Sequence, residues 1–137
     1  MWWMYALLSA LFAALTAIFA KIGIKDVNTD LATAIRTVVI LFLAWGIAYF
    51  RGGVNSIQTL TRHNILFLVL SGIATGLSWI FYFKALQLGK VSQVAPVDKL
   101  SVAIAIILSI VFLGETLTPK LFIGALLIIA GTIVLIL

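Results

Sequence analysis

The sequence predicts an all-α integral membrane protein with five transmembrane helices, and composition and hydropathy are the observations behind this prediction. Of the 137 residues, 64% are hydrophobic, and only nine Lys or Arg and four Asp or Glu carry charge. A soluble domain is about half apolar and about a quarter charged, so a surface of this composition could not be hydrated. The apolar residues also fall into five stretches of about 20 residues, which is the length that an α-helix needs to cross a bilayer.

The first two stretches predict helices at residues 2–24 and 31–50. The first has aromatic residues at its start, where interfacial anchors are common. It is also too long and too aromatic for a cleaved signal peptide. The polar segment Lys25–Asp30 separates the two helices, and we expect Asp30 to be the N-cap of the second.

The other three stretches predict helices at residues 64–88, 92–113 and 119–137. Polar breaks at Arg51–His63, Gly89–Lys90 and residues 114–118 precede them in that order. Thr118 is an expected N-cap, and Pro119 suits the first turn of the last helix. Because the breaks are short, we expect residues 1–137 to form one five-helix domain that acts within the lipid bilayer.

Basic residues are nearly balanced between the two membrane faces. Three flank the N-terminal face (Arg51, Arg62 and Lys120), and four flank the opposite face (Lys21, Lys25, Lys84 and Lys90). Including the deeper Arg36 and Lys99 gives three against six, which favours an outside N-terminus. The weak bias would also suit insertion in both orientations, and an antiparallel homodimer of such chains reproduces the inverted repeats of many transporters. The basic residues are dispersed, so no nucleic-acid partner is expected.

Three ionisable residues lie deeper in the membrane than the helix ends, where charge is costly and is usually functional. They are Arg36 in helix 31–50, and Asp98 and Lys99 in helix 92–113. One interpretation is a polar vestibule that attracts an anionic or zwitterionic solute. The other is an Arg36–Asp98 pair that fixes helix packing, with Lys99 extending to the interface.

A polar stripe runs along helix 64–88. Ser71, Thr75, Ser78 and Tyr82 recur at helical spacing on one face, and Trp79 lies beside them. The stripe could line a solute path whose aromatic wall is Trp79 and Tyr82. Alternatively, the small polar residues serve helix packing, with their hydroxyls bonded to their own backbone.

Helix 92–113 carries a second polar face. Asp98, Ser101 and Ser109 share this face, and Pro96 near its start removes one backbone hydrogen bond. The carbonyl left free by this helix break could meet a ligand or water, although a simple kink is the alternative. The solute path expected from both helices comprises Thr75, Ser78, Trp79, Tyr82, Asp98, Lys99 and Ser101.

Catalytic chemistry is poorly supported. The chain has no Cys and a single His, and it shows no carboxylate pair at metal spacing and no Gly-rich phosphate loop. A nucleophile and base pair of the kind that covalent catalysis needs is also missing. We therefore expect no enzyme, no bound metal and no cofactor.

Four segments resemble the EamA domain of the drug/metabolite transporter superfamily. They are Leu77–Leu86, Val94–Pro96, Ile107–Pro119 and Ile123–Gly131. Together they give an order of aromatic residues, Ala-Leu, Ala-Pro and Leu-Gly-Glu that is fairly specific as a set. Five helices in a short chain resemble the bacterial and archaeal five-helix branch of that superfamily, and the resemblance covers nearly the whole chain.

The resemblance implies a secondary transporter of small metabolites or drug-like solutes in the plasma membrane of a prokaryote. It implies that this chain is one half of an inverted-repeat transporter and works as a homodimer by alternating access. Gly124 and Gly131 match the spacing that mediates dimerisation in the related small multidrug resistance proteins. Helix 2–24 lacks the carboxylate that couples those exporters to protons, which leaves Asp98 as the candidate replacement. The alternatives are a non-transporting accessory subunit and one half of a heteromeric transporter.

Overall fold

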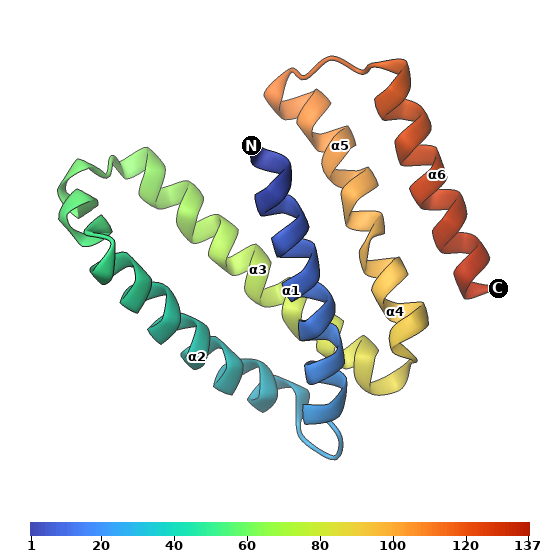
Figure 1. Cartoon of the computed structure of the whole chain (residues 1–137), viewed down its shortest axis with the longest axis horizontal. Helices are drawn as coiled ribbons and strands as arrows, with labels where there is room; N and C mark the ends of the chain where they lie inside the picture. The colour runs from blue at the N-terminus through green and yellow to red at the C-terminus, as the bar shows by residue number, and fades with distance from the viewer. The chain divides into compact units, whose positions relative to one another are not determined.

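The computed structural model describes residues 1–137 and consists of helices joined by short loops (Figure 1). Five segments are long and apolar enough to cross a bilayer: Trp2–Gly23, Thr29–Phe50, Arg62–Leu88, Val91–Leu113 and Pro119–Ile136. The predicted all-α membrane fold with five transmembrane helices is therefore confirmed. Each end lies within two residues of the position expected from hydropathy.

The chain separates into two compact units. The first unit is Phe19–Gln87, and the second joins Met1–Ile18 to Leu88–Leu137. One boundary falls inside helix α1 (Trp2–Gly23), and the other falls at the end of helix α3 (Arg62–Leu88).

The unit Phe19–Gln87 is built mainly from α2 (Thr29–Phe50) and α3. A short 3₁₀ helix, η1 (Gly53–Thr59), follows α2 and packs back on it. The prediction that Asp30 caps α2 is wrong, because the Asn28 side chain accepts the backbone N–H groups of Asp30 and Leu31 at 2.9 and 3.1 Å. Asn and Asp cap equally well, and the helix begins before its first apolar residue.

The other unit contains α4 (Val91–Asp98), α5 (Leu100–Leu113) and α6 (Pro119–Ile136). Helix α6 packs against both α4 and α5. The predicted cap of α6 is confirmed, since the Thr118 hydroxyl accepts the backbone N–H of Leu121 at 3.3 Å and Pro119 occupies the first turn. Helix α5 ends at Gly114, whose positive φ of 68° allows the Glu115 N–H to bond back to the Ser109 carbonyl.

Most large apolar side chains point outward. The buried apolar residues are few: Ala17, Ile24, Phe83, Leu86 and Ala103. Patches of exposed apolar surface much larger than a few hundred Å² are unusual on soluble monomers. This surface therefore suits lipid, or another copy of a membrane protein, rather than water.

Candidate functional site

An arginine and three aromatic side chains form a cluster in the unit Phe19–Gln87. The half-buried guanidinium of Arg36 on α2 lies 2.8 Å from the ring centroid of Trp79 on α3. The ring centroid of Phe83, one turn further along α3, is 5.3 Å from the same guanidinium. This is a cation–π arrangement, which is strongest where water is excluded. The sequence predicted functional roles for Arg36 and Trp79 without predicting this contact.

Helical spacing explains why these side chains meet. Thr29, Thr33 and Arg36 share one face of α2, and the two threonines are buried. On α3, Trp79 and Phe83 stand one turn apart, with their ring centroids separated by 5.7 Å. The cluster therefore lies between the facing sides of α2 and α3, and Arg36 is its only charged member.

Tyr82 completes the aromatic cluster. Its ring centroid is 6.4 Å from that of Phe83. The Phe83 side chain is 1% exposed, and its ring contacts those of both Tyr82 and Trp79. Trp79 and Tyr82, two of the predicted solute-contacting residues, therefore both contact the buried ring of Phe83. We call Arg36, Trp79, Tyr82 and Phe83 the arginine–aromatic cluster.

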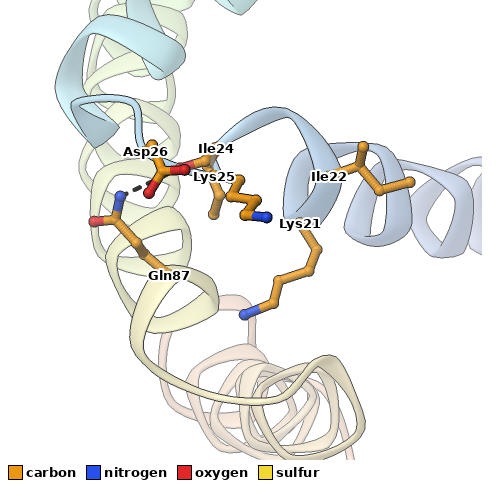
Figure 2. Close-up of a pocket in the computed structure, with 6 residues that line it drawn as sticks. All are labelled: Lys21, Ile22, Ile24, Lys25, Asp26 and Gln87. Atoms are coloured by element: carbon orange, nitrogen blue, oxygen red, sulfur yellow. Dashed lines mark hydrogen bonds between the residues drawn. The ribbon is translucent and has the colours of Figure 1, made fainter.

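A pocket lies where α1 ends in the same unit (Figure 2). Its volume is about 690 Å³, and its lining residues are Lys21, Ile22, Ile24, Lys25, Asp26 and Gln87. The two lysines and one aspartate leave a net positive lining. Asp26 adopts a left-handed backbone conformation with φ of 59°, which Asp tolerates better than most residues. We call this cavity the lysine pocket.

Two side chains at the lysine pocket donate hydrogen bonds to backbone carbonyls at the end of the neighbouring helix. Lys21 near the end of α1 donates its ammonium to the Leu86 carbonyl near the end of α3. Gln87 donates its amide to the carbonyls of Ile24 and Val27 at 3.3 and 2.9 Å, just after α1 ends. The last carbonyls of a helix have no hydrogen-bond partner within it. The Lys21 and Gln87 side chains therefore supply donors to carbonyls at the ends of α3 and α1.

The other unit holds its charges differently. Asp98 and Lys99 form an ion pair of 3.2 Å, at the point where α4 ends and α5 begins. Pro96 lies inside α4, and its carbonyl accepts the buried hydroxyl of Thr132 on α6 at 3.3 Å. The predicted helix 92–113 is therefore interrupted three residues after its proline, and α6 contacts the backbone next to the break.

Other predicted site residues are exposed on the chain. Thr75, Ser78 and Ser101 are exposed, and the Thr75 hydroxyl donates to the Ser71 carbonyl of its own helix at 2.8 Å. Such a bond to the residue's own helix backbone is what we expect if the polar residues of α3 serve helix packing. Lining of a solute path by these residues stays a prediction, and so does the Arg36–Asp98 pair, whose members belong to different units.

The two glycines of the predicted dimer contact have open surroundings. A Cβ atom added at Gly124 or Gly131 would meet no neighbouring atom within 4 Å. Nothing in the chain itself therefore requires glycine there. No group of three or more His, Cys, Asp or Glu is placed to hold a metal ion.

Sequence reasoning did not identify Gln87, Thr132 or the central position of Phe83. Gln87 and Thr132 are lone polar residues near the ends of apolar helices, and such residues find internal acceptors when water is absent. That rule marks them as structurally important, but it does not name the acceptor. The central position of Phe83 depends on helix rotation, which hydropathy does not report.

Comparison with known proteins places the chain in a family. The EamA-like transporter family matches residues 1–137. A Sinorhizobium sp protein described as "Uncharacterized transporter in cobO 3'region" is 48% identical over 134 residues, which cover 98% of this chain and 95% of that protein. An uncharacterized Methanocaldococcus jannaschii protein is 39% identical over 77 residues, which cover 56% of each chain. No solved structure matches. The chain belongs to the EamA-like transporter family.

Proposed function

We propose that this membrane protein is a secondary transporter of small organic solutes in the plasma membrane of a prokaryote. In this proposal it works as an antiparallel homodimer by alternating access, and the chain supplies one half of an inverted repeat. The family match over the full chain supports transport, and so does the similarity to a protein described as a transporter. The solute path runs past Trp79 and Tyr82 and reaches Asp98, Lys99 and Ser101.

The observation that carries the proposal is the interrupted span Val91–Leu113. It is apolar enough to cross a bilayer, and the regular helix is broken for one residue, Lys99, where α4 and α5 meet. The Lys99 N–H still donates to the Ala95 and Pro96 carbonyls at 3.3 and 3.0 Å, so this is a local bend after Pro96. Substrate and ion sites of secondary transporters are typically formed by discontinuous helices near charged or unwound backbone. The Asp98–Lys99 ion pair stands at this interruption, so charged groups are available for a solute or a coupling ion.

A flux measurement tests the function. Purified protein is reconstituted into liposomes, and uptake is followed for three probes that cross bare lipid slowly: benzenesulfonate, benzyltrimethylammonium and phenylalanine. We expect saturable uptake of at least one probe. Trp79→Ala and Asp98→Ala should each lower that uptake about tenfold or more, the loss typical of a lost positioning or charge interaction.

Trp45→Ala is the matched control for the aromatic residue. Trp45 also lies in a spanning helix and is 55% exposed, so its loss should leave uptake within twofold of wild type. Uptake of all three probes no faster than into protein-free liposomes would contradict transport and favour the accessory-subunit hypothesis. Unchanged uptake in Tyr82→Ala, Asp98→Ala and Lys99→Ala would contradict the proposed solute path.

A crosslinking measurement tests the dimer. If α6 pairs antiparallel about a point midway between Gly124 and Gly131, each glycine faces the other one on the partner. The chain lacks Cys, and both positions have room for a side chain. Co-expressed Gly124→Cys and Gly131→Cys chains should therefore form a mixed disulfide, whereas either variant alone should form little. Efficient crosslinking of Gly124→Cys with itself would indicate parallel helices and contradict the proposed dimer.

A further inference from the structure

Arg36 is a charged group inside a spanning helix without a carboxylate partner in its own unit. It lies seven residues after the start of α2, which is about 10 Å along the axis at 1.5 Å per residue. The ion pair in the structure is Asp98–Lys99, and no hydrogen bond reaches the Arg36 guanidinium from Phe19–Gln87. A charge at such depth normally pairs with another group or marks a substrate pathway.

The contacts of Arg36 leave its hydrogen-bonding edge available. Trp79 and Phe83 interact with the guanidinium through their rings. The two ring planes are inclined at 68° to each other, so the guanidinium can lie flat against at most one of them. Phe83 is almost fully buried, so packing holds one of the two rings that contact Arg36. Neither ring supplies an oxygen acceptor for the five N–H donors of the guanidinium. The guanidinium therefore has no oxygen partner in this unit, and a guanidinium binds carboxylate, phosphate and sulfonate groups in bidentate fashion.

The lysine pocket is a second, independent feature with the same charge preference. Lys21 and Lys25 line it beside a single carboxylate, that of Asp26. It opens where α1 ends, and the chain order puts the start of α2 and the end of α3 at the same membrane face. A positively lined concavity raises the local concentration of anions, and its volume falls within the range of small-molecule pockets. The unit therefore offers cationic groups at the interface and a further one about two turns deeper.

We propose that Arg36 anchors the acidic group of an organic anion, and that the flat or aromatic body of this anion packs beside Trp79. The inference rests on the proposed transport function and names its substrate class. Solutes with a carboxylate, phosphate or sulfonate group should be accepted, and cations of similar size should be rejected. The phosphate of an anionic lipid has the same chemistry, so the experiment must separate a dissolved solute from a lipid.

Binding is measured by the fluorescence of Trp79, without any flux. Replacing the other three tryptophans by phenylalanine (W2F, W3F and W45F) leaves Trp79 as the sole indole. The protein is placed in phosphatidylcholine nanodiscs and titrated with benzenesulfonate, benzyltrimethylammonium and benzyl alcohol. We expect a saturable change with benzenesulfonate, at a concentration at least tenfold lower than for the other two probes.

Variants at Arg36 separate charge from geometry. Arg36→Gln should abolish the preference for benzenesulfonate, and Arg36→Lys should retain a weakened preference because the charge stays but the planar fork is lost. Arg51→Gln removes the same charge from the exposed C-cap of α2 and should bind like wild type. Arg36→Lys also keeps the test informative if Arg36→Gln does not fold.

Four outcomes would overturn the proposal. The first is equal binding of the three probes by wild type, and the second is a preference for benzenesulfonate that is undiminished in Arg36→Gln. The third is benzenesulfonate binding that appears only in Asp98→Asn. The fourth is loss of benzenesulfonate binding when phosphatidylglycerol is added to the nanodiscs. The third would show that Asp98 already occupies Arg36, and the fourth would assign the site to a lipid headgroup. Failure of the transport proposal looks different, because binding would then persist while liposome uptake was absent. Saturable uptake of the cation alone would overturn the anion site and leave transport intact.

Discussion

The two units handle intramembrane charge in different ways. In Phe19–Gln87, Arg36 rests on the buried aromatic surface of α3 and has no carboxylate beside it. In the unit that contains α4, α5 and α6, Asp98 and Lys99 neutralise each other at an interrupted helix. In the first arrangement the charged group contacts aromatic rings, whereas in the second it is paired with a carboxylate where α4 meets α5. The anion site proposed above and the bend at Lys99 therefore belong to different units.

The largest expected effect on stability comes from removing the Phe83 ring at the centre of the arginine–aromatic cluster. Phe83→Ala should lower the free energy of unfolding by about 3–5 kcal/mol, because it deletes a buried aromatic ring and leaves a cavity. The measurement is reversible unfolding in mixed detergent micelles. Phe81→Ala is the control on the same helix, since Phe81 is 70% exposed and its loss should change stability little. Equal losses for the two variants would show that Phe83 does not support a packed surface.

A smaller effect is expected where the helix ends cap each other. Gln87→Leu should lower the free energy of unfolding by about 1–2 kcal/mol, since the carbonyls of Ile24 and Val27 lose their donor. Gln58→Leu in the exposed 3₁₀ helix η1 makes the same chemical change and should have almost no effect. If the two variants had the same stability, the capping exchange would not hold this unit together.

The smallest stability effect is expected at the interrupted helix. Pro96→Ala restores a backbone donor inside α4 and should raise the free energy of unfolding by about 1 kcal/mol. It should also slow probe uptake several-fold if bending at Lys99 serves transport. Pro119→Ala is the control, because Pro119 lies in the first turn of α6, where an N–H has no helical partner. Faster uptake in Pro96→Ala would contradict a role for this interruption.

Hydropathy was sufficient to predict the five spans, because a bilayer leaves few alternatives to long apolar helices. The cap at Thr118 was also predictable, since a capping residue precedes a proline there. The prediction chose Asp30 as the cap of α2, but Asn28 caps equally well and is the residue that does so. The proline predicted to break helix 92–113 lies in α4, three residues before Lys99. Sequence reasoning named Arg36 and Trp79 as site residues but did not predict the contact between them, and the Arg36–Asp98 pair stays a prediction. Which partner a charge takes depends on helix rotation, and only three-dimensional packing reports that rotation.

In the proposed antiparallel homodimer, two copies of this chain insert in opposite orientations, and single-cysteine labelling distinguishes this from a fixed orientation. Asn55 in η1 and Ser92 at the start of α4 are exposed, and five spans put them on opposite membrane faces. Asn28 is unsuitable because its side chain caps α2. Asn55→Cys and Ser92→Cys are treated in intact and permeabilised cells with a thiol reagent that cannot cross the membrane. Insertion in both orientations should give partial labelling of both sites in intact cells. Complete labelling of one site and none of the other would show a fixed orientation and contradict the antiparallel homodimer.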